Sequence, residues 1–210
     1  MPLPDPMPLV ARAPVIPVLT IEAVRDAVPL AKALLAGGIK VIEVTLRSAA
    51  ALDAIKAIAE EVPEVVIGAG TVTKPADIAA AARSGAKYLV SPGTPAELAD
   101  ALADAKLPAI PGCATATEAM TLAARGFKLL KFFPAEACGG IAWLKSVAAP
   151  LPNLRFCPTG GIDMKNAAAY LALPNVVAVG GSWVAPREAI ARGDFAAVTK
   201  LARAAAALRR

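Results

Sequence analysis

A chain of 210 residues is long enough for one domain with a sizeable hydrophobic core. Hydrophobic residues make up 57% of the sequence and charged residues 19%, a globular composition that excludes a disordered chain. The sequence contains no histidine, which excludes Ser-His-Asp triads, Cys-His nucleophiles and histidine-based metal sites. Proton transfer must therefore fall to Glu, Asp, Lys, Tyr, Cys or bound water.

Charge and cysteine content limit the partners. The net charge is a mild +5 and aromatic residues make up 4%, so nucleic-acid binding is poorly supported while a small anionic substrate fits. No apolar run reaches the roughly 18–20 residues that cross a bilayer, and the N-terminus does not resemble a signal peptide. The three cysteines are widely spaced and suggest neither a disulfide framework nor a zinc site. We expect a cytoplasmic protein without a membrane partner or a metal.

Short β-branched apolar segments alternate with alanine-rich stretches along the chain. We predict strands at residues 14–19, 40–46, 64–72, 87–92, 107–113, 128–134, 154–160 and 175–182. Strands that alternate with helices of this length indicate βαβ units and a parallel sheet. Such units close into a (β/α)8 barrel, whereas a doubly wound sheet would carry a glycine-rich fingerprint after its first strand. That fingerprint is absent, so we expect a single-domain barrel over residues 12–210 after a short N-terminal extension over residues 1–11.

The helices between these strands have recognisable ends. Candidate N-caps, two of them with a Glu three residues later, are Ser48, Thr73, Thr94 and Thr115. Glycines placed where helices should end are Gly37, Gly85 and Gly126. Pro29 is awkward inside the first helix, which we expect to begin late or to kink there.

Alternating side chains place three charged residues on the inner face of the predicted barrel. In KVIEVTLR (40–47), Ile42 and Val44 suit the helix layer, which turns Glu43 and Arg47 inward. In KLLKFFP (128–134) the same alternation turns Lys131 inward. Desolvation favours the neutral amine of a buried lysine, and a neutral amine attacks carbonyl carbons. We therefore interpret Lys131 as an imine-forming nucleophile.

Each of these residues also has a structural explanation. Lys131 could extend its amine out of the barrel end, or pair structurally with Glu43. Glu43 could be the acid/base that moves protons on and off the substrate, or a buried partner of Arg47. Arg47 could hold a substrate carboxylate with its bidentate fork, or make a surface ion pair.

Two glycine pairs end the last two predicted strands, in Thr159-Gly160-Gly161 and in Gly180-Gly181-Ser182. In barrels, the loops after strands seven and eight often bind phosphate through backbone N–H groups. A single glycine pair usually only turns the chain, but two at consecutive strand ends favour a phosphate site. Gly68 and Gly70 could serve packing or leave space for a ligand.

Seven segments together resemble one enzyme family in order along the chain. GIKVIEVTLR (38–47) and GFKLLKFFPAEACGG (126–140) are similar to the two active-site segments of class I 2-keto-3-deoxy-6-phosphogluconate aldolases. IGAGTV (67–72), LVSPG (89–93), IPGCATATEA (110–119), RFCPTGGI (155–162) and VGGSWV (179–184) resemble the same family. The resemblance runs from about residue 12 to the C-terminus, and the short N-terminus and Cys138 depart from the family pattern.

The resemblance implies a (β/α)8 barrel that assembles as a homotrimer and needs no metal or organic cofactor. It implies cleavage of 2-keto-3-deoxy-6-phosphogluconate to pyruvate and glyceraldehyde 3-phosphate, and often of 4-hydroxy-2-oxoglutarate as well. By motif position Lys131 is the Schiff-base lysine and Glu43 the general acid/base, and Arg47 and Thr71 hold the pyruvate carboxylate. The remaining implied residues line the site (Pro92, Phe133 and Thr159) or bind phosphate (Gly160, Gly161, Gly180, Gly181 and Ser182).

Three alternatives remain beside this resemblance. A sister enzyme acts on the galactonate epimer, although Thr45 and Arg47 favour the gluconate enzyme. Metal-dependent barrel epimerases fit poorly because their sites rely on histidine. A non-catalytic phosphate-binding or assembly scaffold is the alternative from a different class, and a pyruvate-release assay separates it from an enzyme.

Overall fold

The computed structural model describes residues 3–208, and its strands are short and regularly spaced. They are β1 (Val15–Leu19), β2 (Val41–Thr45), β3 (Val66–Gly70), β4 (Tyr88–Val90), β5 (Ala109–Ile110), β6 (Gly112–Cys113), β7 (Leu129–Phe132), β8 (Arg155–Pro158) and β9 (Val179–Gly181). Each of the eight predicted strand segments contains at least one of them. The segment 107–113 contains two, because Pro111 has no backbone N–H and interrupts the hydrogen-bonded ladder between β5 and β6.

The strands form two parallel sheets, which confirms the predicted parallel pairing. A six-stranded sheet has the order β5-β4-β3-β2-β1-β9, and a three-stranded sheet has the order β6-β7-β8. The register pairs Glu43 with Gly68 across β2 and β3, and Lys131 with Cys157 across β7 and β8. Beyond the named strands, isolated parallel bridges join residue 156 to residue 176 and Thr159 to Gly180.

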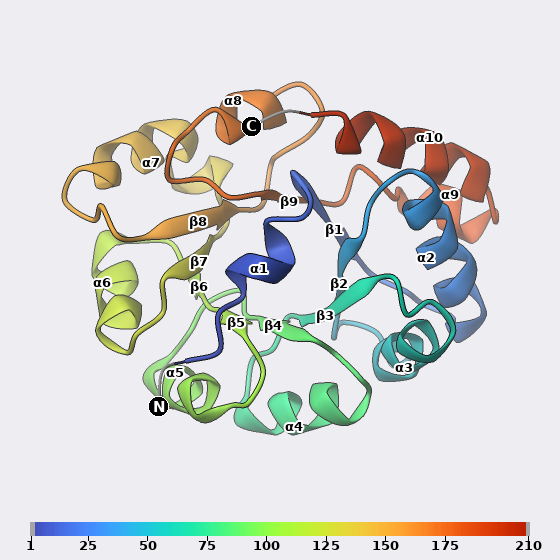
Figure 1. The fold of residues 1–210 in the computed structure, drawn as a ribbon, viewed down its shortest axis with the longest axis horizontal. Coiled ribbons are helices and arrows are strands. Elements are labelled where there is room, and N and C mark those ends of the chain that lie inside the picture. The colour runs from blue at the N-terminus through green and yellow to red at the C-terminus, as the bar shows by residue number, and fades with distance from the viewer. Residues whose placement is uncertain (1–2, 209–210) are drawn as a thin grey trace.

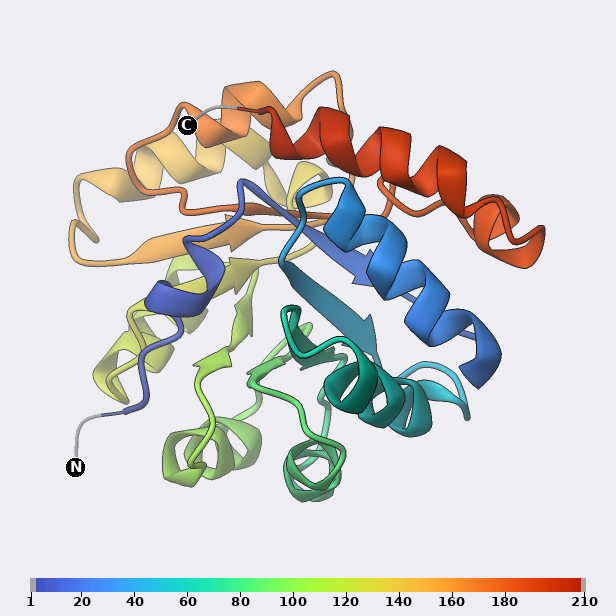
Figure 2. The ribbon, with the colours of Figure 1, turned by 45° about the vertical axis from the view of Figure 1, so that its right-hand side comes forward.

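The helices lie on the outside of the strands. They are α2 (Ala27–Ala36), α3 (Ala51–Glu61), α4 (Pro75–Arg83), α5 (Ala96–Asp104), α6 (Ala116–Ala124), α7 (Gly140–Ala148), α8 (Ala167–Leu171), α9 (Arg187–Ala191) and α10 (Phe195–Ala206), with 3₁₀ turns η1 (Val24–Asp26) and η2 (Glu136–Cys138). Figure 1 shows the strands around the middle of the molecule and these helices at its periphery. The short helix α1 (Met7–Val10) lies over the middle instead, and the turned view in Figure 2 shows the helices outside the strands again.

Two buried clusters of apolar side chains correspond to the two faces of the strands. Ile42, Val44, Leu130 and Phe132 belong to the larger cluster, together with side chains of the helices. The smaller cluster contains Val10 from α1 and, from the strands, Ile16, Val41, Tyr88, Val90, Ile110, Leu129 and Cys157. The predicted alternation on β2 and β7 is therefore confirmed.

Most predicted helix ends are confirmed, and three predicted N-caps are wrong. Thr115 caps α6, because its hydroxyl accepts from the Glu118 amide. The Thr94 hydroxyl instead donates to the Gly112 carbonyl oxygen at 2.9 Å, so it is engaged with β6 and cannot cap α5. Ser48 donates to the Ile21 carbonyl, and Ala50 and Lys74 take the N-cap positions that Ser48 and Thr73 were expected to fill.

The first long helix begins late, as Pro29 suggested. The 3₁₀ turn η1 precedes it, and Pro29 lies in the first turn of α2, where a missing N–H costs no helical hydrogen bond. Gly37 ends the helix, and Gly85 and Gly126, with φ of 90° and 97°, directly follow the C-caps of α4 and α6. Among the helices within residues 3–208, none combines the length and apolar character needed to cross a membrane.

Candidate active site

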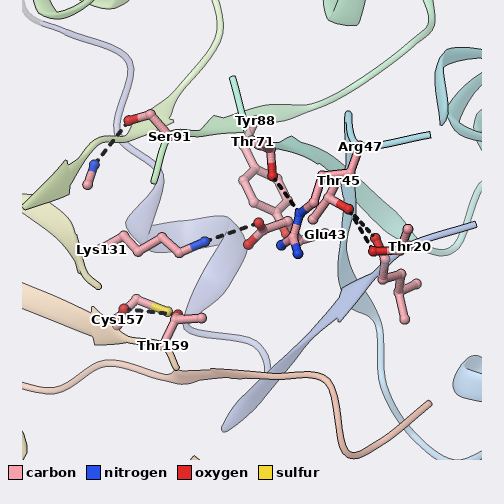
Figure 3. Close-up of polar contacts among 12 residues, drawn as sticks. Thr20, Glu43, Thr45, Arg47, Thr71, Tyr88, Ser91, Lys131, Cys157 and Thr159 are labelled. Atoms are coloured by element: carbon pink, nitrogen blue, oxygen red, sulfur yellow. Dashed lines mark hydrogen bonds and ion pairs between the residues drawn. The ribbon is translucent and has the colours of Figure 1, made fainter. Parts of the chain in front are cut away.

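A buried lysine and a buried glutamate meet between the two sheets. Lys131 lies on β7 of the three-stranded sheet and Glu43 on β2 of the six-stranded sheet. Lys131 Nζ donates to Glu43 Oε1 at 3.2 Å, and both side chains are only 5% exposed. Figure 3 shows the two side chains extended toward each other from opposite strands.

This geometry decides between the explanations that the sequence left open for Lys131. An amine extended into solvent is wrong, because the side chain is almost completely buried. The pairing with Glu43 is present, so the neutral amine does not follow from burial alone. The two side chains form an ion pair, and a protonated amine is not a nucleophile. A nucleophilic amine therefore requires its proton to pass to a base, and Glu43 lies within hydrogen-bond distance.

Gly70 on β3 leaves the space that the Glu43 carboxylate occupies. A Cβ atom at Gly70 would overlap Oε1, Cδ and Cγ of Glu43. On the other side Tyr88, itself fully buried, donates from its hydroxyl to the Ile42 carbonyl oxygen at 2.8 Å. Burial and the charge of Glu43 raise the pKa of Tyr88 well above its usual value, so this phenol stays a donor. The hydrogen bond from Tyr88 thus fixes the backbone next to Glu43.

A cavity of about 690 Å³ opens above the buried pair. Its volume is typical of a small-molecule site. The predicted residues that line it are Arg47, Thr71, Pro92, Phe133, Thr159, Gly160, Gly161, Gly180, Gly181 and Ser182. Glu43 and Lys131 are buried and do not belong to the lining, but Lys131 Nζ is 5.3 Å from the centroid of the Phe133 ring, which does. The structure thus gathers the predicted binding residues around one cavity, while the two predicted catalytic residues lie outside its lining.

Arg47 and Thr71 are held together on one side of the cavity. The Arg47 guanidinium donates from Nε to the Thr71 hydroxyl at 3.2 Å, as Figure 3 shows. Thr71 has a φ of 58°, a left-handed conformation that β-branched residues rarely adopt. Such strain concentrates at functional sites, where it fixes the direction of a side chain. This arrangement leaves the remaining guanidinium N–H groups of Arg47 available for an anionic group.

The two glycine pairs lie on another side of the cavity. Gly160 and Gly161 have φ of 100° and 76°, which non-glycine residues rarely adopt. Within residues 3–208, neither the Gly161 amide nor the Ser182 amide donates a hydrogen bond to a protein acceptor. These N–H groups are therefore free for an anionic ligand.

A side-chain contact supports this glycine loop from the preceding turn. The fully buried Tyr170 of α8 donates its hydroxyl to Glu136 of η2. A Cβ atom at Gly161 would meet Cβ and Cγ of Glu136, and the Glu136 amide donates to the Gly160 carbonyl oxygen at 3.1 Å. The turn after β7, the loop after β8 and helix α8 are thereby fixed to one another.

Several cavity residues were not foreseen from the sequence. They are Val18, Thr20, Ile162, Trp183, Ala185, Pro186, Arg187 and Glu188. Thr20 follows β1, and its hydroxyl lies 3.1 Å from the hydroxyl of the buried Thr45. Alternation along the first strand could have indicated Thr20. The segment 183–188 gives no such signal, because its position depends on how the chain turns after β9.

Cys157 lies beside the reactive pair, on the strand that neighbours Lys131. Burial raises the pKa of its thiol to about 12, although the charge of Lys131 opposes the rise. The thiol therefore stays protonated near neutral pH and does not compete as a nucleophile. Within residues 3–208, no group of three or more Cys, Asp or Glu side chains is placed to hold a metal ion.

Comparison with known proteins gives the family that the sequence motifs resemble. The family model described as "KDPG and KHG aldolase" matches residues 8–201. The "KHG/KDPG aldolase" of Escherichia coli (strain K12) is 48% identical over 197 residues, which cover 94% of this chain and 92% of the relative.

Solved structures extend the likeness to the fold. The KDPG aldolase of Legionella pneumophila, "with pyruvate captured at low pH as a covalent carbinolamine intermediate", superposes with a TM-score of 0.95 at 44% identity and covers 97% of this chain and 99% of its own. The 2-keto-3-deoxy-6-phosphogluconate aldolase of Zymomonas mobilis ZM4 "with 3-phosphoglycerate" has a TM-score of 0.91 at 46% identity, with coverage of 97% and 96%.

Proposed function

This chain belongs to the KDPG and KHG aldolase family, and on that premise we propose that it is a class I aldolase. It cleaves 2-keto-3-deoxy-6-phosphogluconate to pyruvate and glyceraldehyde 3-phosphate, and 4-hydroxy-2-oxoglutarate to pyruvate and glyoxylate. The observation that carries the proposal is the buried contact of 3.2 Å between Lys131 Nζ and Glu43 Oε1 at the base of the cavity. A pyruvate carbinolamine in the Legionella relative supports covalent chemistry of the same kind here.

The first part of the mechanism makes the substrate an electron sink. Glu43 accepts a proton from Lys131, which leaves a neutral amine and a carboxylic acid in a site with little access to water. The amine nitrogen attacks the C2 ketone and forms a carbinolamine. The protonated Glu43 then donates to the departing hydroxyl, so water leaves and an iminium forms on Lys131.

The second part breaks the carbon–carbon bond. Glu43, again a carboxylate, takes the proton of the C4 hydroxyl, the C3–C4 bond breaks, and its electron pair moves into the iminium as an enamine. The aldehyde leaves. Glu43 returns the proton to C3, and hydrolysis of the pyruvate iminium releases pyruvate and the free lysine. In this scheme one carboxylate serves every proton transfer, and no histidine is needed.

Anchoring of the two ends of the substrate accounts for the remaining residues. Arg47 and Thr71 hold the carboxylate next to the reacting ketone, and Pro92, Phe133 and Thr159 form the walls. The free amides at Gly161 and Ser182, with Gly160, Gly180 and Gly181, receive the phosphate. Fixing both ends sets C2 against Lys131 and the C4 hydroxyl against Glu43. No cofactor enters this scheme.

The complete barrel and the assembly are part of the proposal. Only Pro111 separates β5 from β6, and bridges join Phe156 to Val176 and Thr159 to Gly180, which supports closure of the two sheets into one (β/α)8 barrel. We further propose that residues 12–210 form its single domain and that three copies associate in the cytoplasm. Light scattering of the purified protein measures the number of copies.

The sister galactonate activity is the nearest alternative. It differs from the proposed reaction only in the configuration at C4, and Arg47 and Thr45 favoured the gluconate substrate on sequence grounds. Rates on the two C4 epimers, measured side by side, decide between them. A non-catalytic scaffold of the same fold would release no pyruvate from either epimer.

Borohydride trapping tests the role of Lys131 directly. Reduction in the presence of pyruvate should leave one 1-carboxyethyl group on the nitrogen of Lys131, and Lys131→Met should abolish both the adduct and pyruvate release. Lys128→Met is a matched control, because Lys128 precedes the same strand and is exposed. An adduct on another lysine, or none in an active enzyme, would overturn the assignment.

A further inference from the structure

Two charged residues of the cavity wall, Arg187 and Glu188, have no role in the function proposed above. Within residues 3–208, three of the residues that line the cavity carry a charge: Arg47, Arg187 and Glu188. Arg47 is committed to the side that it shares with Thr71. Arg187 begins α9 and lies five residues after Ser182, which directly follows the Gly180-Gly181 pair of β9. Along the chain it therefore follows the glycine pair that we assign to the phosphate.

Arg187 is also free to bind. Within residues 3–208 its side chain makes no hydrogen bond and no ion pair with another residue. By contrast, Arg125 is paired with Asp100 at 2.6 Å, and Arg155 donates to the Pro152 carbonyl oxygen at 2.8 Å. A guanidinium without a protein partner on a cavity wall keeps all five of its N–H donors for a ligand.

The strands that precede the two arginines are spaced to suit a substrate with an anion at each end. Arg47 follows β2 and Arg187 follows β9, and only β1 lies between these strands in the sheet. Two strand spacings are roughly 10 Å, a separation that a six-carbon chain can bridge between its C1 carboxylate and its C6 phosphate. Glu188 is exposed, and its carboxylate repels an anion in the cavity. The positive charge of Arg187 also offsets this repulsion.

We propose that Arg187 contacts the terminal phosphate and sets the preference of this enzyme for phosphorylated over unphosphorylated 2-keto-acids. The proposal rests on the aldolase function proposed above and goes beyond it, because the glycine loops bind phosphate only through neutral N–H groups. A guanidinium adds a charge-assisted contact, which is stronger with a phosphate dianion than with the single charge of the distal carboxylate of 4-hydroxy-2-oxoglutarate. The carboxylate of 4-hydroxy-2-oxoglutarate next to its ketone is left to Arg47.

The test compares specificity ratios rather than single rates. The ratio is kcat/KM for 2-keto-3-deoxy-6-phosphogluconate divided by kcat/KM for 4-hydroxy-2-oxoglutarate, both measured by coupled detection of pyruvate. Arg187→Gln should lower this ratio roughly tenfold, mainly through KM, since one charge-assisted hydrogen bond contributes on the order of that factor. Arg187→Lys keeps the charge and should restore at least half of the ratio.

Arg192→Gln is the matched control. Arg192 ends the same helix, is exposed and does not line the cavity, so its loss removes an equal charge from the protein without a contact to substrate. The proposal is supported if the ratio for Arg187→Gln falls at least threefold relative to Arg192→Gln and recovers in Arg187→Lys. A smaller fall, or a fall without recovery, overturns it. Pyruvate release by the wild-type enzyme separates this result from a failure of the aldolase function itself.

Discussion

A single methyl group at Gly70 should separate the catalytic role of Glu43 from its structural role. A Cβ atom there would overlap Glu43 Oε1, Cδ and Cγ, and nothing else is as close. Normal contacts between such atoms are about 3.5–4.0 Å, so Gly70→Ala displaces the carboxylate by on the order of 1 Å. A displacement of that size commonly lowers turnover about 100-fold when it moves a reacting group.

The fold should survive this change. Overpacking of one methyl group lowers the free energy of unfolding by about 1–3 kcal/mol, which leaves most domains folded. We therefore expect Gly70→Ala to keep its circular dichroism and cooperative unfolding while kcat for pyruvate release falls by about two orders of magnitude.

Gly93→Ala is the control for the chemical change itself. It adds the same methyl group in a loop near the cavity, where nothing lies within 4 Å of the added atom. We expect wild-type turnover from it. If a folded Gly70→Ala protein keeps a kcat within about threefold of Gly93→Ala, Glu43 does not transfer the protons that limit the reaction.

Three further results follow from the contacts described above. Burial raises the pKa of Cys113 and of Cys157 from 9.0 to about 12. Between these pH values the unfolded chain releases protons that the folded chain keeps, so the free energy of unfolding should fall as pH rises. In urea titrations, Cys157→Ala should reduce that alkaline slope by up to about 1.4 kcal/mol per pH unit, and an unchanged slope would contradict the assignment. Tyr170→Phe should cost about 1 kcal/mol of unfolding free energy and raise KM for the phosphorylated substrate, with Tyr88→Phe as a comparison that leaves the glycine loop intact. Glu43→Leu should destabilise the protein by about 3–5 kcal/mol, because Lys131 is then buried without its partner, and Glu43→Leu with Lys131→Met should recover most of the loss.

The strands and their faces could be predicted from the sequence because alternation with period two is a local property. This argument places Glu43 and Lys131 on the inner faces of their strands. Their contact follows once these inner faces are turned toward each other. The N-cap at Thr115 was also local, since its partner lies three residues later. These features need no knowledge of the rest of the chain.

Features that depend on distant segments could not be predicted in this way. Thr94 is not an N-cap, because its hydroxyl donates a hydrogen bond to the carbonyl oxygen of Gly112 in β6. The left-handed backbone of Thr71 gives no sequence signal, since β-branched residues usually avoid it. Arg187 reaches the cavity only through the path of the chain after β9, which neither charge nor periodicity indicates.

The position of the Glu43–Lys131 pair also links chemistry to the folding of the whole chain. Its two members are 88 residues apart and belong to different sheets. A partly folded chain can hold either strand without bringing the amine near its base. A nascent or truncated protein should therefore carry no misplaced nucleophile that reacts with cellular ketones, and the appearance of aldolase turnover during refolding reports the moment at which both halves have joined.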